Sequence, residues 1–367
     1  MSHFRFMNAR LPDPAYTKAA IVERLDMHLR KLKAVKKGQI RPLKTDGEID
    51  ELKWLDQLDD VRLSMNDRHK IDRRATVISQ RHAAATGLSH LKAEDTKKLD
   101  VLRHGVRLSL VASEHQADEV ASALHEEFPW MGPATETLWH AMRRSVRAGE
   151  PGLCVPPMLL DGPPGIGKSA WARALGELIG SPTMVYEATN ENASFGLVGS
   201  QRGWGNANPG RLISSVLQHR FGNPVVVIDE LDKSGRVTSI KGQTYALTDA
   251  LLPLLEPSSA KGWTCPYFEV KFDMSFVIWV LTSNDHRRLP EPLLSRCPPI
   301  RLRELAINDL IIFAQRQGLR RGLSVMAVEV IVEALRRGAQ PGHMSLRTVG
   351  RMIDKAVSLQ NRGSFLH

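Results

Sequence analysis

The sequence has 367 residues, which is too long for one ordinary domain and suggests two or three. With 42% apolar and 25% charged residues, its composition is that of a soluble globular protein and excludes wholesale disorder. The formal net charge of +10 permits an acidic partner such as nucleic acid but does not identify one.

No apolar run approaches the roughly 18 residues that a membrane-spanning helix needs. The N-terminus has no apolar stretch behind its first charges, so no secretory signal is predicted. The three cysteines, at positions 154, 265 and 297, are too far apart for a zinc site or a disulfide framework. These features favour a cytoplasmic protein without a membrane partner.

Residues 1–125 are predicted to form a basic, mostly helical region. Ile21, Leu25, Leu29 and Leu32 are spaced as on one face of a helix, and similar patterns recur over 52–63 and 99–110. Two basic runs lie in this region, over 30–44 and 62–81, but acidic residues are interleaved with them. A solvated helical face or a protein-docking surface is therefore favoured over a nucleic-acid site.

Residues 126–303 are predicted to form an α/β core, because apolar runs of strand length alternate with helical patterns. The runs are 157–160, 184–188, 225–228, 276–281 and 300–302. This alternation is typical of a parallel sheet with crossover helices. Helical patterns return over 307–317, 325–336 and 345–358, so we expect a small helical domain over residues 304–367.

One motif points directly to nucleotide chemistry. It fits the phosphate-loop pattern G-x-x-x-x-G-K-[ST] and reads Gly162-Pro163-Pro164-Gly165-Ile166-Gly167-Lys168-Ser169. A predicted strand precedes it and a predicted helix follows it, so backbone N–H groups and the helix N-terminus converge on one point. We expect these eight residues to bind ATP, with Lys168 on the β- and γ-phosphates and Ser169 on Mg²⁺.

A second apolar strand, 225–228, ends in Asp229 and Glu230 at the edge where open α/β sheets bind ligands. Asp229 suits a Mg²⁺ role, and Glu230 is then free to act as the general base on the attacking water. The strand 276–281 leads to Asn284, whose amide can orient that water. Arg296, twelve residues later, ends a short predicted helix and could stabilise transition-state charge on a neighbour's nucleotide.

These motifs occur in an order that resembles an AAA+ ATPase, and the ATPase module of Lon proteases in particular. The similarity covers roughly residues 128–360. It rests on Leu197-Val198-Gly199-Ser200-Gln201-Arg202-Gly203-Trp204, Pro209-Gly210-Arg211, Asp229-Glu230-Leu231-Asp232-Lys233, residues 251–257 and Tyr267-Phe268-Glu269-Val270.

The resemblance implies a role for several single residues and for the oligomer. Asn284 corresponds to sensor 1, Arg296 to an arginine finger that acts in trans, and Arg347, on a helix of the C-terminal lid, to sensor 2. Trp204 corresponds to the pore-loop aromatic that contacts substrate. The resemblance also implies a homo-oligomer, a hexameric ring, that hydrolyses ATP with Mg²⁺ and remodels or translocates a protein substrate.

Two departures from Lon leave alternatives open. The sequence given ends at His367, about twenty residues after Arg347, so a peptidase domain is not expected within it. The N-terminal region shows no defensible likeness to the Lon substrate-binding domain. A DNA-associated AAA+ ATPase of a transposition or defence system, or a scaffold that binds ATP as a switch, therefore remains an alternative.

Overall fold

In the computed structural model, residues 4–37, 42, 54, 58, 60–189, 194–203, 207–238, 244–338 and 344–360 are described. Their contacts divide the chain into two compact units. One comprises Ala9–Arg103, and the other comprises the first eight residues with His104–His367. The predicted three-part division at residues 125 and 303 stays a prediction. Among the described residues, no helix is both long and apolar enough to cross a membrane.

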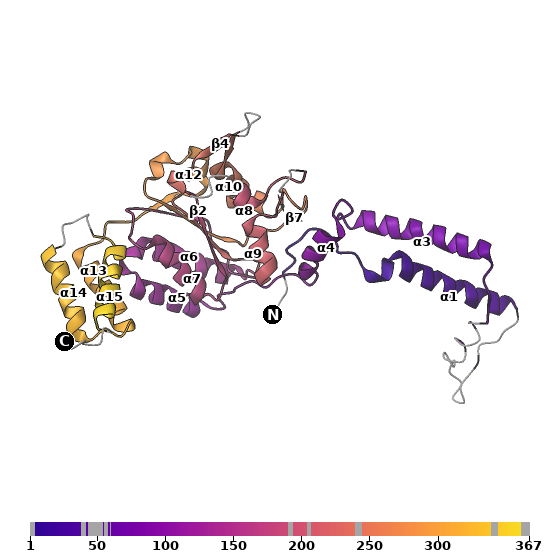
Figure 1. The fold of residues 1–367 in the computed structure, drawn as a ribbon, viewed down its shortest axis with the longest axis horizontal. Coiled ribbons are helices and arrows are strands. Elements are labelled where there is room, and N and C mark those ends of the chain that lie inside the picture. The colour runs from indigo at the N-terminus through magenta and orange to yellow at the C-terminus, as the bar shows by residue number, and fades with distance from the viewer. Residues whose placement is uncertain are drawn as a thin grey trace, which may run out of the picture. The chain divides into compact units, whose positions relative to one another are not determined.

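The larger unit is built on a five-stranded parallel sheet, as the alternating pattern predicts (Figure 1). The strands lie in the order β2-β3-β8-β1-β9. The first strand in sequence, β1, therefore lies between the last two, β8 and β9, and crossover connections join the parallel strands. Their bounds are β1 Met158–Asp161, β2 Thr183–Glu187, β3 Val225–Asp229, β8 Ile278–Ser283 and β9 Pro299–Arg301. Every residue of β1 and β8 is buried, which explains why these strands are apolar up to the polar residues at their C-terminal ends.

Alternate residues of the strands pack with three helices into one apolar core. This core joins one face of β1, β3 and β8 to α5 (Glu114–Glu127), α6 (Gly132–Ala148) and α7 (Lys168–Leu178). The same unit contains α8 Phe195–Val198, α9 Arg211–His219, α10 Leu247–Leu255, α11 Pro257–Ala260 and α12 Glu291–Arg296. The short helices are η3 Pro129–Met131, η4 Leu231–Lys233 and η5 His286–Arg288.

Two small antiparallel pairs, which the sequence patterns do not predict, accompany the main sheet. β4 (Arg236–Thr238) pairs with β5 (Thr244–Ala246), and β6 (Trp263–Thr264) pairs with β7 (Lys271–Phe272). Strands of two or three residues are too short to show a clear periodicity.

The three C-terminal helices gather at one end of this unit, where Figure 1 shows them side by side. They are α13 Ile307–Arg320, α14 Val325–Gly338 and α15 Leu346–Gln360. Their apolar faces join the core of the sheet, and the ring of Phe313 lies edge-on to Trp130 of η3 with centroids 6.4 Å apart. The predicted C-terminal helices are therefore confirmed, and they are packed against the segment that precedes α6.

The unit Ala9–Arg103 is helical, as predicted. Its elements are η1 Pro14–Tyr16, α1 Lys18–Lys36, α3 Met65–Ala85, α4 Ala93–Leu99 and η2 Asp100–Leu102. α1 and α3 lie against each other (Figure 1). Sequence periodicity does not predict α3, whose start is set by a capping box between Ser64 and Asp67.

The helix predicted over 99–110 is wrong beyond Leu102. Gly105 has a positive φ of 81°, and Val106 forms an isolated β-bridge with Phe4. The apolar spacing that suggests a helix face here belongs to extended chain, because backbone pairing outweighs local periodicity. Half of the predicted helix over 52–63 lies outside the described residues. Trp54 and Leu58 are helical and buried, but residues 61–63 are not helical, so the prediction is wrong at that end.

Candidate functional site

The loop between β1 and α7 has the backbone that its glycines make possible. Gly165 and Gly167 have positive φ values of 77° and 94°, a region that other residues rarely adopt. The loop is also fixed from outside: the Trp130 indole Nε1 donates to the carbonyl of Ile166 at 2.7 Å. At its start, the amide of Gly162 donates to the carbonyl of Ser283 at 3.1 Å. The loop is therefore held in shape by the core beneath it.

Lys168, the first residue of α7, is only 7% exposed. Its Nζ donates to the carbonyls of Gly162 and Pro163 at 2.6 and 3.0 Å, and to Oδ1 of Asn284 at 3.0 Å. Burial lowers its pKa to about 8, and nearby carboxylates, led by Asp229, oppose that shift. All three acceptors are neutral oxygens, so a phosphate would be a stronger partner for this ammonium.

At the end of β3, one hydroxyl contacts both the Asp229 carboxylate and the backbone of Glu230. Oγ1 of Thr282, which is fully buried, donates to Oδ1 of Asp229 at 2.6 Å and accepts from the amide of Glu230 at 2.9 Å. Glu230 has a positive φ of 54°, and its Oε1 accepts from Nζ of Lys233 at 2.8 Å. Thr282 belongs to no motif that the sequence displays, and its place at the end of β8 is the signal that could have indicated it.

Asn284 lies between the phosphate loop and the carboxylates. Its backbone N–H donates to Oδ1 of Asp232 at 3.1 Å, while its side-chain Oδ1 accepts from Nζ of Lys168. The structure therefore brings Lys168, Asn284 and the end of β3 to one edge of the sheet. A cradle of backbone N–H groups, one buried ammonium and a pair of carboxylates fits a triphosphate with Mg²⁺. Ser169, half-buried in the first turn of α7, follows directly on this cradle.

Arg347 approaches this site from α15. The amide of Leu346 donates to the carbonyl of Gly165 at 3.1 Å, and a Cβ on Gly165 would lie 2.6 Å from Cβ of Ser345. Arg347 is exposed and lines a cavity of about 350 Å³ together with Pro163 and Gly165. The start of α15 thus contacts the phosphate loop directly.

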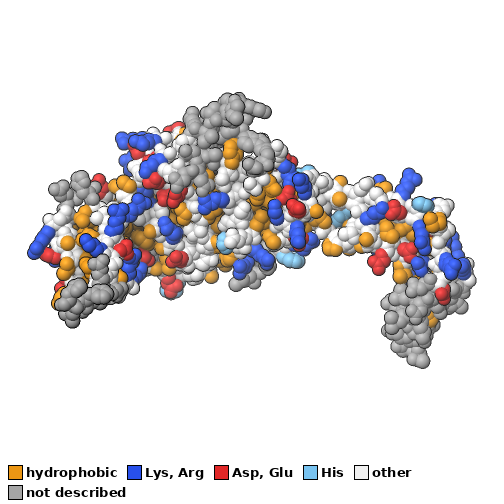
Figure 2. Space-filling model, viewed as in Figure 1, with side chains coloured by type: hydrophobic (Ala, Val, Ile, Leu, Met, Phe, Trp, Pro, Cys, Tyr) orange, Lys and Arg blue, Asp and Glu red, His pale blue; other side chains and the backbone are white. Residues whose placement is uncertain are grey.

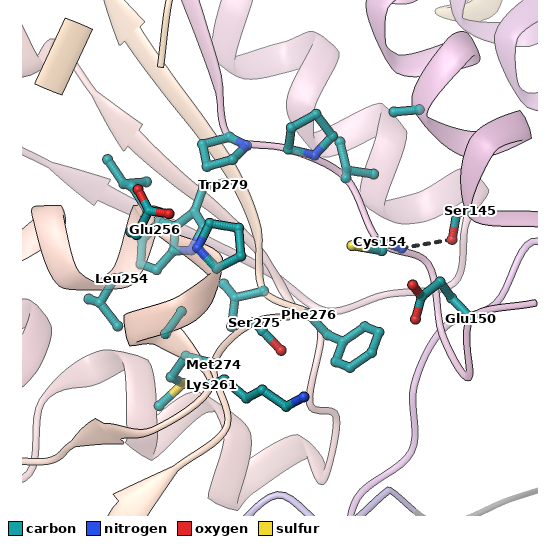
Figure 3. Close-up of a pocket in the computed structure, with 18 of the residues that line it drawn as sticks. Ser145, Glu150, Cys154, Leu254, Glu256, Lys261, Met274, Ser275, Phe276 and Trp279 are labelled. Atoms are coloured by element: carbon teal, nitrogen blue, oxygen red, sulfur yellow. Dashed lines mark hydrogen bonds between the residues drawn. The ribbon is translucent and has the colours of Figure 1, made fainter. Parts of the chain in front are cut away.

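Arg296 lies elsewhere in the larger unit. At the end of α12 its Nη1 donates to the carbonyl of Pro292 at 2.9 Å, and its Nε lies 3.7 Å from Oε2 of Glu256. Arg296 lines a cavity of about 940 Å³ that contains no residue of the phosphate loop; Figure 3 shows part of its lining, with Glu256 and Trp279. Trp204 lies outside the described residues.

The described residues contain no cluster of three or more His, Cys, Asp or Glu side chains that could hold a metal by themselves.

Comparison with known proteins agrees with this geometry. Residues 158–305 match the family model of the ATPase family associated with various cellular activities (AAA). The chain is 32% identical to Lon protease 2 of Thermus thermophilus over an alignment of 183 residues. This alignment covers 49% of the chain and 22% of the relative. It is 31% identical to the Lon protease of Chlamydia trachomatis over 205 residues, an alignment that covers 54% of this chain and 24% of the relative. The chain thus spans less than a quarter of these relatives' length.

Proposed function

We propose that this chain, which contains an AAA ATPase domain with distant partial similarity to the ATPase region of Lon proteases, hydrolyses ATP in a homo-oligomeric, hexameric ring. The ring uses the energy to remodel or translocate a protein substrate. No peptidase activity is proposed, because the matching residues cover only about a fifth of the proteases' length.

Binding depends on the loop from Gly162 to Ser169. Its backbone N–H groups and the N-terminus of α7 attract phosphate oxygens, and Lys168 exchanges its neutral acceptors for the β- and γ-phosphates. Ser169 and Asp229 would hold Mg²⁺, which neutralises phosphate charge when bound. Arg347 would approach the γ-phosphate from α15.

Hydrolysis depends on the edge formed by β3 and β8. Glu230 accepts the proton of the attacking water, and Asn284 orients that water by its amide. Thr282 fixes the geometry because one hydroxyl binds both Asp229 and the Glu230 backbone. Arg296 would complete the pocket of the neighbouring protomer, since within its own chain it lines a separate cavity.

One observation carries this proposal. The buried Lys168 ammonium donates a hydrogen bond to Oδ1 of Asn284, the residue that directly follows β8. Two side chains from different motifs, 116 residues apart in the sequence, are therefore in direct contact. A structural glycine turn would not need a buried cation in contact with a second strand end.

The variant Glu230→Gln tests the catalytic part. ATP turnover is expected to fall at least about 100-fold, while ATP binding persists and the oligomer becomes more stable. Glu177→Gln, an exposed acid on α7, serves as the matched control and should leave turnover unchanged. If Glu230→Gln hydrolyses ATP normally, the base is another group. If the unaltered protein binds ATP but hydrolyses almost none, it is a switched scaffold.

Trp204→Ala tests the mechanical part, which rests on the resemblance to Lon. Loss of ATP-dependent unfolding of a tagged fluorescent protein, with ATP turnover intact, is the expected result. Normal unfolding by this variant would remove Trp204 from the pore. Turnover that is stimulated by duplex DNA, and not by unfolded protein, would instead favour the DNA-associated alternative.

The nucleic-acid alternative has less support from the basic residues of the helical unit. Lys18 pairs with Asp72 at 2.7 Å and Arg30 with Asp26 at 2.6 Å, so part of the positive charge is balanced. Figure 2 shows Lys and Arg side chains interspersed with Asp and Glu on the visible face. Binding to phosphates needs an excess of cations over a continuous surface.

A further inference from the structure

A buried carboxylate lies directly before the phosphate loop. Asp161, the last residue of β1, is 8% exposed. Its Oδ1 accepts from the backbone amide of His286 at 2.9 Å, and its Oδ2 lies 2.8 Å from His286 Nδ1. Its carbonyl accepts from the amide of Leu302 at 2.8 Å. This one residue therefore joins β1 to the chain that follows β8 and to the end of β9.

His286 follows Asn284 by two residues and begins η5. On the other side of the same segment, Oδ1 of Asp232 accepts a hydrogen bond from the backbone N–H of Asn284 at 3.1 Å. The segment that presents the Asn284 side chain is thus attached at both flanks. One attachment is to the exit of β3 and the other is to the exit of β1.

The attachment to β1 differs from an ordinary surface contact. The His286 side chain is 20% exposed and that of Asp161 is 11% exposed, so solvent screens the pair only weakly. A buried carboxylate is stable only if its oxygens are hydrogen-bonded, and His286 supplies a donor to one and a ring nitrogen to the other. Because the two contacts come from backbone and ring of one residue, they restrict both its position and its orientation.

We propose that His286 is a positioning residue for ATP hydrolysis, which holds Asn284 at the γ-phosphate through its two contacts with Asp161. The inference rests on the proposed function. Loss of the ring contact would leave the loop and Lys168 in place but free Asn284 to move. A displacement of about 1 Å is enough to lower a catalytic rate strongly while binding is little changed.

The first experiment compares three substitutions at one position in the full-length chain. His286→Ala should lower kcat about tenfold and change the Kd for ATP less than about twofold. His286→Asn should recover most of the rate, because its amide nitrogen can stand near the place of Nδ1. His286→Gln, which carries its amide one bond farther out, should not. Arg287→Ala is the matched control, since that neighbouring side chain is 80% exposed.

The second experiment asks whether His286 acts through Asn284. In an Asn284→Ala background, His286→Ala should cause no further loss of kcat, because residues that act as a unit are not additive. The same tenfold loss in both backgrounds would overturn the proposal, as would equal rates for the Asn and Gln variants. Thermal melting of each variant shows whether it is folded. If His286→Ala is unfolded, the comparison between His286→Asn and His286→Gln still tests the proposal.

The two proposals can fail separately. If Asn284→Ala alone leaves turnover unchanged, Asn284 has no role, and the inference about His286 fails with it. If Asn284→Ala and Glu230→Gln both abolish turnover and the His286 variants do not lower it, only the inference about His286 is wrong.

Discussion

The edge of the sheet at the phosphate loop and the helical unit Ala9–Arg103 use polar side chains in different ways. At the sheet edge, buried groups share partners: Lys168 binds three oxygens, and Thr282 joins Asp229 to the Glu230 backbone. In the helical unit, many polar contacts are ion pairs at the surface, such as Lys18 with Asp72, both about half exposed.

A substitution should therefore have a larger effect at the sheet edge than in the helical unit. A side chain with several buried partners cannot be removed without leaving those partners unpaired, so its loss is costly and spreads to its neighbours. A surface ion pair contributes little and can be replaced by water.

The largest effect is expected from Lys168→Met. The substitution removes the ammonium that meets the phosphates and leaves the surrounding carboxylates without a counter-charge, so ATP affinity should fall at least about 100-fold. Fluorescent-nucleotide titration measures it. Lys261→Met, at an exposed lysine of the same unit, should bind ATP normally. Near-normal binding by Lys168→Met would place the nucleotide elsewhere.

Ile21→Ala should have the next largest effect, confined to the helical unit. Ile21 is fully buried on α1, and its truncation should cost about 2–4 kcal/mol of local stability through lost packing and a cavity. Hydrogen exchange of α1 and α3 measures this loss. ATP turnover should be unchanged; an equal loss of turnover would show that the two regions are coupled.

ATP affinity should depend on pH through Lys168. Its pKa is lowered to about 8 by burial, and bound phosphates favour the ammonium form. Affinity should therefore be constant below pH 8 and fall up to about tenfold for each pH unit above it. Nucleotide titrations between about pH 6.5 and about pH 9.5, roughly 1.5 units either side of that pKa, would show this. Lys168→Arg, whose charge persists, should lack the dependence if it binds.

The smallest effect is expected from Lys33→Met in the helical unit. Lys33 and Ser64 hold the pKa of Asp67 well below its usual range, yet the lysine is about a third exposed. Removal of such a surface pair should shift the melting temperature by no more than about 2 °C. A much larger shift would mean that this ion pair contributes more to the stability of the unit than an exposed pair usually does.

Much of the sheet edge could be predicted because its residues carry local signals. The phosphate loop has a fixed spacing, and a buried strand that ends in Asp229 and Glu230 is visible as an apolar run followed by charge. The parallel sheet follows from the alternation of such runs with helices. The match of residues 158–305 to the AAA family agrees with this interpretation.

The remaining features depend on contacts between distant segments. Trp130 reaches the carbonyl of Ile166 across 36 positions, and Thr282 reaches Asp229 across 53. Neither residue type nor spacing indicates such a partner. The wrong helix over 99–110 has the same origin, because Val106 pairs with Phe4 at the other end of the N-terminal segment.

The backbone conformation of Glu230 lowers the stability of the fold at a residue that the proposed activity requires. A residue other than glycine at φ 54° is held in the left-handed region, at a cost of roughly 1–2 kcal/mol for a side chain with a Cβ. Glycine at this position would relieve that cost and make the fold more robust while removing the proposed base. A thermostability screen that ignores function would therefore favour an inert ATPase here.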